Sequence, residues 1–152
     1  MADIGLIPCG QKKLKTVENG LFKYSPKIKA EELYTSELFK TTLEYSKLIH
    51  DKTYILSAKH HLLKLDDKIE SYNKNLNDME ESEILEWAKN TSKQLKDKIS
   101  DSDKVYIMTG KTYWKYLIDE IPGEKILLMQ GMGFGHRLQW MKNEILKYRE
   151  KI

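Results

Sequence analysis

Ile4-Gly-Leu-Ile-Pro8 is a short run that is apolar on both faces and ends in a proline, and three similar runs follow it along the chain. These are Thr53-Tyr-Ile-Leu-Ser57, Val105-Tyr-Ile-Met-Thr109 and Lys125-Ile-Leu-Leu-Met129. Each run has the length of a strand and is rich in Ile, Val, Leu or Tyr, which is typical of parallel strands buried on both faces. The sequence therefore predicts four buried strands.

Segments with helical periodicity separate these runs. The first begins near Ser36, which we expect to be its N-cap, and the second follows Asp78 and Glu81, which have capping-box spacing. A short third helix is expected to stop at Pro122-Gly123, and the last to begin near His136. Strands and helices thus alternate along most of the chain.

This alternation predicts an α/β fold, in which a four-stranded parallel sheet of order 2-1-3-4 carries helices on both faces. The length of 152 residues suits a single domain over residues 1–152. The stretch from Cys9 to Tyr34 interrupts the pattern. Within it, Asn19-Gly20 is typical of a two-residue hairpin turn, although a plain loop fits as well.

Composition excludes several classes of protein. With 40% hydrophobic and 32% charged residues, the chain is globular and neither disordered nor collagen-like. Its apolar runs are too short to cross a membrane, and no secretory signal precedes them. A single cysteine, Cys9, excludes a disulfide within the chain and a Cys-rich zinc site. We therefore expect a cytoplasmic protein that needs no metal or cofactor and makes no membrane contact.

Charge is distributed unevenly around a net value of +3. Residues 1–30 and 125–152 are basic, whereas residues 66–86 are acidic. If the fold brings the two ends together, they would offer a basic face to an anionic ligand such as a nucleotide or a nucleic acid. The alternative is that these are ordinary solvated faces.

Ligands of parallel α/β sheets bind beyond the carboxyl ends of the strands, so the four loops there are the candidate sites. In the first loop, Cys9 and Gly10 turn the chain, and Lys12 and Lys13 would help to cradle an anion. The Cys9 thiol is either a binding or packing group or, with a base nearby, a nucleophile.

The second loop offers Ser57, Lys59 and His60 directly after a strand, and Asp66 follows. His60 suits general base or electrophilic chemistry near neutral pH, and Asp66 would activate water. Lys59 or His60 would then stabilise a leaving base. The alternative is that these are polar loop residues and turn formers.

The fourth loop has glycines at 131, 133 and 135 and a basic group, Arg137, at the start of a helix. Such glycines admit a ligand close to the backbone, and a helix N-terminus attracts phosphate. A Gly-rich turn shaped only by packing is the alternative. Neither the dinucleotide fingerprint nor a Walker A loop is present.

Aromatic residues and a hydroxyl complete the predicted binding set. Tyr34 and Ser36 precede a helix, and Tyr113 and Trp114 follow the third strand. Aromatic rings are able to stack on a base. We expect Tyr113 to contact a ligand and Trp114 to pack in the core.

Four motifs of the chain are Leu6-Ile-Pro-Cys-Gly-Gln-Lys-Lys13, Leu33-Tyr-Thr-Ser-Glu-Leu-Phe39, Leu56-Ser-Ala-Lys-His-His-Leu-Leu63 and Gly131-Met-Gly-Phe-Gly-His-Arg-Leu-Gln-Trp140. In this order they resemble the motifs of a family of small bacterial and phage proteins, known as a domain of unknown function. The resemblance spans nearly the whole chain and implies no established activity.

This sequence departs from the family pattern in three places. Gln11 stands where Lys is more usual, His61 stands where Gly is usual, and the spacer from Leu14 to Lys27 is longer. These departures leave room for a shifted substrate.

Two hypotheses of function follow. The predicted sheet and its polar loops are similar to the uracil-DNA-glycosylase-like fold, an analogy that suggests hydrolysis of an N-glycosidic bond in a nucleoside or nucleic acid. The alternative is a non-catalytic protein that binds a nucleotide or nucleic acid, for example in conflict between phage and host.

Overall fold

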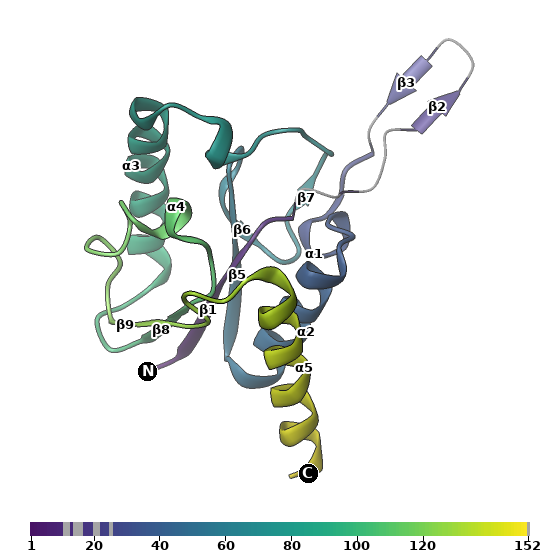
Figure 1. Cartoon of the computed structure of the whole chain (residues 1–152). Coiled ribbons are helices and arrows are strands. Elements are labelled where there is room, and N and C mark those ends of the chain that lie inside the picture. Colours follow the sequence, from purple (N-terminus) through teal and green to yellow (C-terminus); the bar gives the residue numbers. More distant parts are fainter. Residues whose placement is uncertain (11–12, 14–16, 20–21, 25, 152) are drawn as a thin grey trace.

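The computed structural model describes residues 1–10, 13, 17–19, 22–24 and 26–151, with backbone only at 17–19 and 22–24. At its centre is a five-stranded sheet of order β6-β5-β1-β8-β9 (Figure 1). These strands are β6 (His61–Lys64), β5 (Lys52–Ser57), β1 (Asp3–Pro8), β8 (Lys104–Ile107) and β9 (Glu124–Leu127).

The four predicted strands are present, and they are parallel to one another in the order β5-β1-β8-β9. The prediction of a four-stranded, all-parallel sheet is nevertheless wrong, because β6 adds a fifth strand, antiparallel, at the edge beside β5. After Ser57 the chain reverses at once, so that Ser57 pairs with His61 and Tyr54 with Lys64. The adjacent Leu62 and Leu63 give β6 no alternating pattern, which is why the sequence reads as a loop there.

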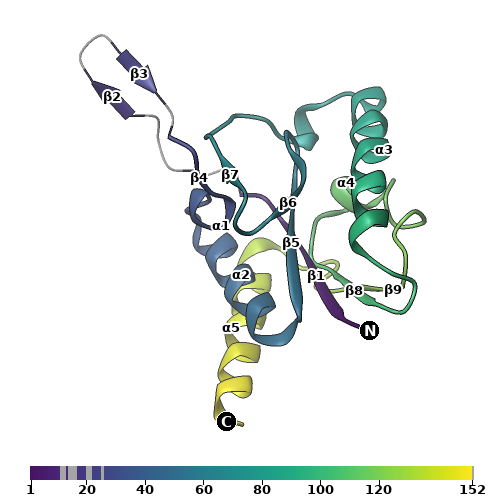
Figure 2. The same cartoon turned by 180° about the vertical axis from the view of Figure 1, so that it is seen from behind.

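Helices cover both faces of the sheet, as the sequence predicted (Figures 1 and 2). One face carries α3 (Glu81–Lys98) and α4 (Lys111–Trp114). The other carries α1 (Ala30–Leu33), α2 (Glu37–Ile49) and α5 (Phe134–Glu150).

Neighbouring residues of β1 point to opposite faces, which builds two hydrophobic cores. Ile4 and Leu6 pack with α3, where Trp87 and Leu95 are buried. Ile7 packs on the other side, with Phe39 of α2. The two-sided apolarity of the predicted strands therefore reflects a sheet with a core on each face.

The sequence predicted the N-terminus of α2 correctly but placed the capping box of α3 too early. Ser36 is the N-cap of α2, and its Oγ accepts a hydrogen bond from the Phe39 amide at 3.1 Å. Asp78, by contrast, ends the short 3₁₀ helix η1 (Leu76–Asp78). The capping box of α3 is formed by Glu80 and Glu83, two residues later than the spacing suggested.

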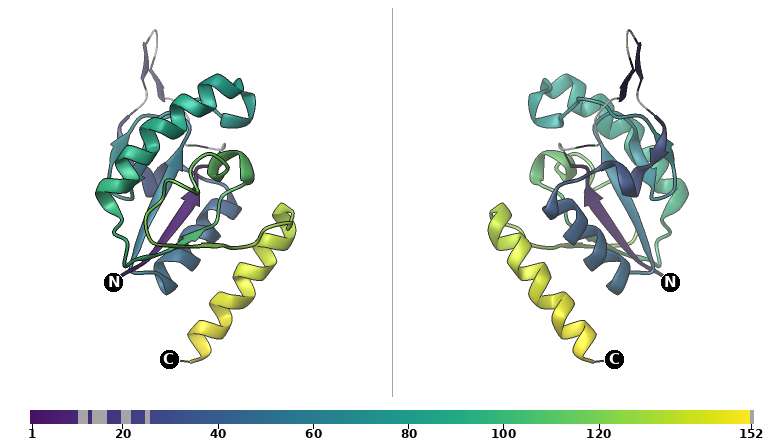
Figure 3. Two further views of the ribbon diagram at one scale, coloured as in Figure 1. Left: turned by 90° about the vertical axis from the view of Figure 1, so that its left-hand side faces the viewer. Right: turned by 90° about the vertical axis from the view of Figure 1, so that its right-hand side faces the viewer.

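The stretch after Cys9 has secondary structure of its own. Strands β2 (Val17–Asn19) and β3 (Phe22–Tyr24) pair as an antiparallel hairpin; the turn between them lies outside the described residues. Further along, β4 (Ile28–Lys29) pairs with β7 (Lys68–Ile69). Figure 3 shows that the β2–β3 hairpin extends from the end of the sheet toward which the β1 arrow points.

Several basic side chains of the C-terminal segment form ion pairs with acidic side chains. Lys142 Nζ of α5 lies 2.6 Å from Glu37 Oε1 of α2, and Arg149 of α5 forms an ion pair with Glu44 of α2. This part of the basic segment therefore resembles an ordinary solvated surface. No helix in the described part of the chain is long and apolar enough to cross a membrane.

Candidate functional site

The chain order of the sheet reverses at β1, which lies between β5 and β8. The carboxyl ends of these three strands lead to Cys9, Ser57 and Thr109 respectively. Cys9 is held beside β5 by a hydrogen bond from its amide to the Leu56 carbonyl at 3.1 Å. This is the position at which open α/β sheets bind their ligands.

Three tyrosines gather at this edge, and with Cys9, Ser57 and His60 they form what we call the tyrosine cluster. The hydroxyls of Tyr34 and Tyr72 lie 2.6 Å apart, and Tyr72 Oη lies 2.8 Å from Ser57 Oγ. Ser57 Oγ also accepts a hydrogen bond from the His60 amide at 3.0 Å. A series of hydrogen-bonding groups thus connects Tyr34, which precedes α2, with the loop after β5.

The third tyrosine connects the cluster to α3. Tyr113 Oη lies 3.6 Å from Cys9 Sγ, and the Tyr113 ring meets the Trp87 ring edge-on at 5.7 Å. Trp87 Nε1 donates to the Ser57 carbonyl at 2.8 Å. The half-buried thiol of Cys9 therefore lies beside a tyrosine that packs against α3.

Two buried polar atoms at this edge have no hydrogen-bond partner among the described residues. They are His60 Nε2 and Thr109 Oγ1, and Thr109 is fully buried. They follow β5 and β8, the strands on either side of β1. Most buried polar groups in native proteins are satisfied, so such atoms call for an explanation.

Burial favours the uncharged forms of the three tyrosines and of His60. Burial raises the pKa of Tyr34, Tyr72 and Tyr113, so all three are neutral phenols at pH 7. Burial, with a smaller contribution from Lys59, lowers the pKa of His60 and favours the neutral imidazole. Lys13 Nζ lies 4.4 Å from the centre of the Tyr72 ring, and burial lowers its pKa as well.

The structure brings several predicted site residues together at this edge. Cys9, Tyr34, Ser57 and His60 are in the cluster, and Lys13 lies over it. Two further predicted residues, Gly10 and Ser36, lie nearby.

Gly10 and Ser36 border the cluster. A Cβ at Gly10 would make ordinary van der Waals contacts, at 3.4 Å from Tyr34 Cβ and 3.5 Å from Ser36 Oγ, so Gly10 lies beside both residues without being required there for space. Ser36 is occupied as an N-cap. Lys12 lies outside the described residues.

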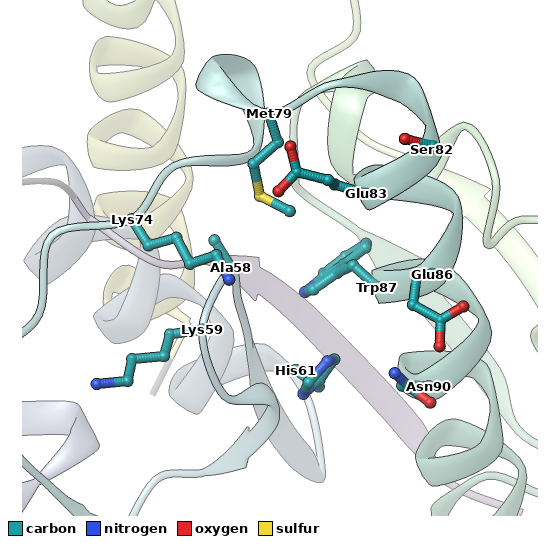
Figure 4. A pocket seen from close by; sticks show the side chains of 10 residues that line it. All are labelled: Ala58, Lys59, His61, Lys74, Met79, Ser82, Glu83, Glu86, Trp87 and Asn90. Atoms are coloured by element: carbon teal, nitrogen blue, oxygen red, sulfur yellow. The ribbon is translucent and has the colours of Figure 1, made fainter.

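Two other predicted residues lie outside the tyrosine cluster. Lys59 is exposed and lines a separate pocket beside α3 (Figure 4). Asp66 is exposed in the turn after β6, which has carried the chain back along β5 from Ser57 to the level of Tyr54. Three residues of strand span about 10 Å, so Asp66 follows a strand that leads away from the cluster.

The glycines of the fourth loop are open to solvent. A Cβ at Gly131, Gly133 or Gly135 would meet nothing within 4 Å, and only Gly131, with φ of +80°, needs to be glycine for its backbone conformation. Arg137 Nε donates to the Met132 carbonyl at 3.0 Å, which closes the loop on itself. No hydrogen bond or ion pair within the described residues joins this loop to the tyrosine cluster.

The sequence as a whole matches a known protein family. The profile described as "Family of unknown function (DUF6884)" matches residues 4–143. The chain belongs to this family. It is also similar to the "Uncharacterized protein YfjM" of Bacillus subtilis (strain 168), with 27% identity over 155 residues and 99% of each chain covered. The predicted membership of a family of unknown function is thus confirmed, while the analogy to uracil-DNA glycosylases stays a prediction.

In this member of the DUF6884 family, three groups at the site were missed by sequence reasoning. Tyr72, Trp87 and Thr109 lie in segments without a recognisable motif, and only Thr109 had a signal, since it ends a predicted strand run. Trp114 packs against the core as expected, although it is half-buried and its Nε1 donates to Gln130 Oε1 at 3.3 Å, whereas Tyr113 is itself buried and its predicted ligand contact stays a prediction.

Metal binding has no support in the described part of the chain. No group of three or more His, Cys, Asp or Glu side chains there is close enough to hold a metal ion. The chemistry at the edge is instead that of a thiol, an imidazole, hydroxyls and an ammonium group.

Proposed function

We propose that this protein binds a nucleotide, free or within a nucleic acid, with the base over the carboxyl end of β1. The observation that carries the proposal is the pair of buried, unpartnered atoms His60 Nε2 and Thr109 Oγ1, whose residues follow the two strands that flank β1. A nucleobase offers hydrogen-bond donors and acceptors on its edges; because both atoms are shielded from solvent, the loops after β5 and β8 must move apart before a base pairs with them.

The surroundings suit such a ligand. A neutral His60 provides one acceptor or donor at Nε2, according to its tautomer, and the Thr109 hydroxyl provides either. The half-buried Lys13 ammonium lies over Tyr72, on the cluster side of the first loop, and would attract a phosphate. The ligand is therefore expected to combine a polar planar ring with an anionic group.

Binding is favoured over N-glycosidic hydrolysis. Hydrolysis needs a group that activates water, and the sequence offered Asp66 for this role. Asp66 is exposed, and β6 leads away from the cluster before it. The tyrosine cluster itself consists of neutral tyrosines, a thiol, a hydroxyl and an imidazole, without a carboxylate.

The test is a calorimetric titration of the protein with nucleosides, 5′-mononucleotides and short single-stranded oligonucleotides, with product analysis of each mixture. We expect at least one mononucleotide to bind and to be recovered intact. Release of a free base would show hydrolysis instead. If no nucleoside, nucleotide or oligonucleotide binds, the proposal is wrong.

A substitution at Thr109 tests the location. Thr109→Val keeps the shape and removes an unpartnered hydroxyl, so stability should be unchanged or slightly higher while nucleotide affinity falls about three- to tenfold. Thr91→Val is the matched control, since Thr91 is equally buried but its hydroxyl donates to the Trp87 carbonyl. It should leave affinity unchanged. Equal affinity in wild type and Thr109→Val would place the ligand elsewhere.

A further inference from the structure

A pocket of about 350 Å³ opens between the turn after β5 and the amino-terminal half of α3 (Figure 4). Lys59 and Lys74 lie at one side of it, and Glu86, Trp87 and Asn90 of α3 line the other. The pocket is large enough for a small ligand. None of its polar side chains belongs to the tyrosine cluster.

One turn separates this pocket from the tyrosine cluster. The His60 ring meets the Tyr72 ring edge-on at 5.3 Å, inside the cluster, whereas the next residue, His61, lines the pocket. Trp87 borders both, because it lines the pocket while its Nε1 donates to the Ser57 carbonyl and its ring contacts Tyr113. The two sites are therefore neighbours that share a wall.

His61 adopts a backbone conformation that most residues avoid. Its φ is +65°, in the left-handed region that favours glycine. This conformation belongs to the tight turn that lets β6 pair with β5. Here the histidine adds an imidazole to the pocket that a glycine would not supply. Burial and Lys74 lower the pKa of His61, so the ring is neutral at pH 7 and able both to donate and to accept.

Besides His61, the polar lining of the pocket comprises two ammonium groups, two carboxylates, a hydroxyl and an amide, from Lys59, Lys74, Glu83, Glu86, Ser82 and Asn90. The ammonium groups of Lys59 and Lys74 make no ion pair with other residues in the described part of the chain, and both side chains are exposed. Across the pocket, Glu86 and Asn90 lie one helical turn apart on α3. A carboxylate and an amide in this arrangement are suited to the amino and ring-nitrogen groups of a base, and the lysines to a phosphate.

We propose that this pocket binds a second nucleotide, next to the one over β1, so that the ligand is a single-stranded nucleic acid of at least two nucleotides. This inference rests on the proposed function of the tyrosine cluster. A single strand is required because both bases must expose their edges, which pairing in a duplex prevents. The chemistry is common to DNA and RNA.

The experiment compares mononucleotides with dinucleotides and tetranucleotides, in deoxyribose and ribose forms, by calorimetric titration of the intact protein. We expect the best dinucleotide to bind at least tenfold more tightly than its mononucleotide. A preference between the two sugar series identifies DNA or RNA as the ligand. Equal affinity for mononucleotide and dinucleotide would overturn the second site while leaving the first intact.

Substitutions in the pocket test whether it accounts for the tighter binding of a dinucleotide. Lys74→Gln and Asn90→Ala should each weaken dinucleotide binding about fivefold or more and leave the Thr109-dependent binding of a mononucleotide unchanged. Lys74→Gln should also reduce by about one the slope of log affinity against log salt concentration. Lys93→Gln, at an exposed position of α3 outside the pocket, is the control and should change the affinity little. Thermal denaturation of each variant verifies that it is folded.

The outcomes separate the two proposals. If no nucleotide or oligonucleotide binds, both are wrong. If mononucleotide binding depends on Thr109 but the pocket variants bind dinucleotides like wild type, only the second site is wrong. If mononucleotide binding depends on Asn90 and not on Thr109, the pocket is the sole nucleotide site, which overturns the two-site arrangement.

Discussion

The hydroxyl oxygens of Tyr34 and Tyr72 lie 2.6 Å apart, although 38 residues of sequence separate them. Tyr72 continues this contact to Ser57 Oγ, so a single phenol connects the segment before α2 with the end of β5. The side chain of Tyr34 is almost completely buried, at 1% exposure, and water does not replace a lost partner there.

Tyr72→Phe should therefore destabilise the protein. It leaves the buried Tyr34 hydroxyl without its partner and removes one partner of Ser57, at a cost of about 1–3 kcal/mol in the free energy of unfolding. Chemical denaturation measures this cost. Tyr148→Phe, at a partly exposed position of α5, is the control and should stay within about 0.5 kcal/mol of wild type. Equal stability of the two variants would show that the Tyr34–Tyr72 contact contributes nothing.

Gly5 in β1 permits a close approach between the sheet and α2. A Cβ at this position would overlap Ser46 Oγ and lie 2.6 Å from His50 Nδ1. Both atoms belong to a buried network in which Ser46 Oγ lies 2.6 Å from Thr53 Oγ1 and 2.9 Å from His50 Nδ1. Gly5→Ala should therefore cost about 1–3 kcal/mol or more through overpacking, measured by chemical denaturation. If the denaturation midpoint of Gly5→Ala equals that of wild type, α2 moves to accommodate the added methyl group without loss of stability.

Replacing Gly135 with alanine should raise stability, in contrast to the same change at Gly5. It lies in the first turn of α5, and a Cβ there meets nothing within 4 Å. Gly135→Ala should therefore stabilise the protein by about 0.5–1 kcal/mol, because alanine reduces the freedom of the unfolded chain and favours the helix. Thermal unfolding gives the stability, and nucleotide titration of the same variant tests the predicted ligand contact. Unchanged affinity would remove Gly135 from the binding set.

The stability of the protein should fall as the pH drops below about 6.5, the ordinary pKa of histidine. Burial lowers the pKa of His50, an effect that Asp3 and Asp51 oppose only in part. Between the two pKa values the unfolded state binds a proton that the folded state refuses, so unfolding is favoured as the pH falls through this range. Above about pH 6.5 this histidine contributes no pH dependence.

Denaturation midpoints between pH 7.5 and pH 5 measure this dependence. His50→Gln should make the decline shallower, and the remaining slope should come in part from His60 and His61, whose pKa values burial also lowers. A decline of equal slope in wild type and variant would exclude His50 as a source.

Much of the fold is predictable from local sequence. The runs that become β1, β5, β8 and β9 are recognisable because a strand buried on both faces must be apolar on both faces. Ser36 is recognisable as an N-cap because capping depends on residues three apart. The family motifs likewise place Cys9 and Ser57 at strand ends.

Other features depend on distant parts of the chain, and the sequence alone does not reveal them. β6 exists because it pairs with the free edge of β5, and His61 adopts its left-handed backbone at the turn that makes this pairing possible. Tyr72 enters the site only because β4 and β7 pair and bring its segment beside Tyr34.

The sequence by itself determined the α/β class, the four parallel strands and the family, since each depends on short-range pattern. Only the tertiary structure decided which polar groups meet at the end of β1. It brought His60 and Tyr72 together, left the Thr109 hydroxyl buried without a partner among the described residues, and left Lys59 and Asp66 exposed outside the cluster. The physical reason is that hydrogen-bond partners at a sheet edge come from separate strands and loops, and their spacing in sequence carries no information about their distance in space.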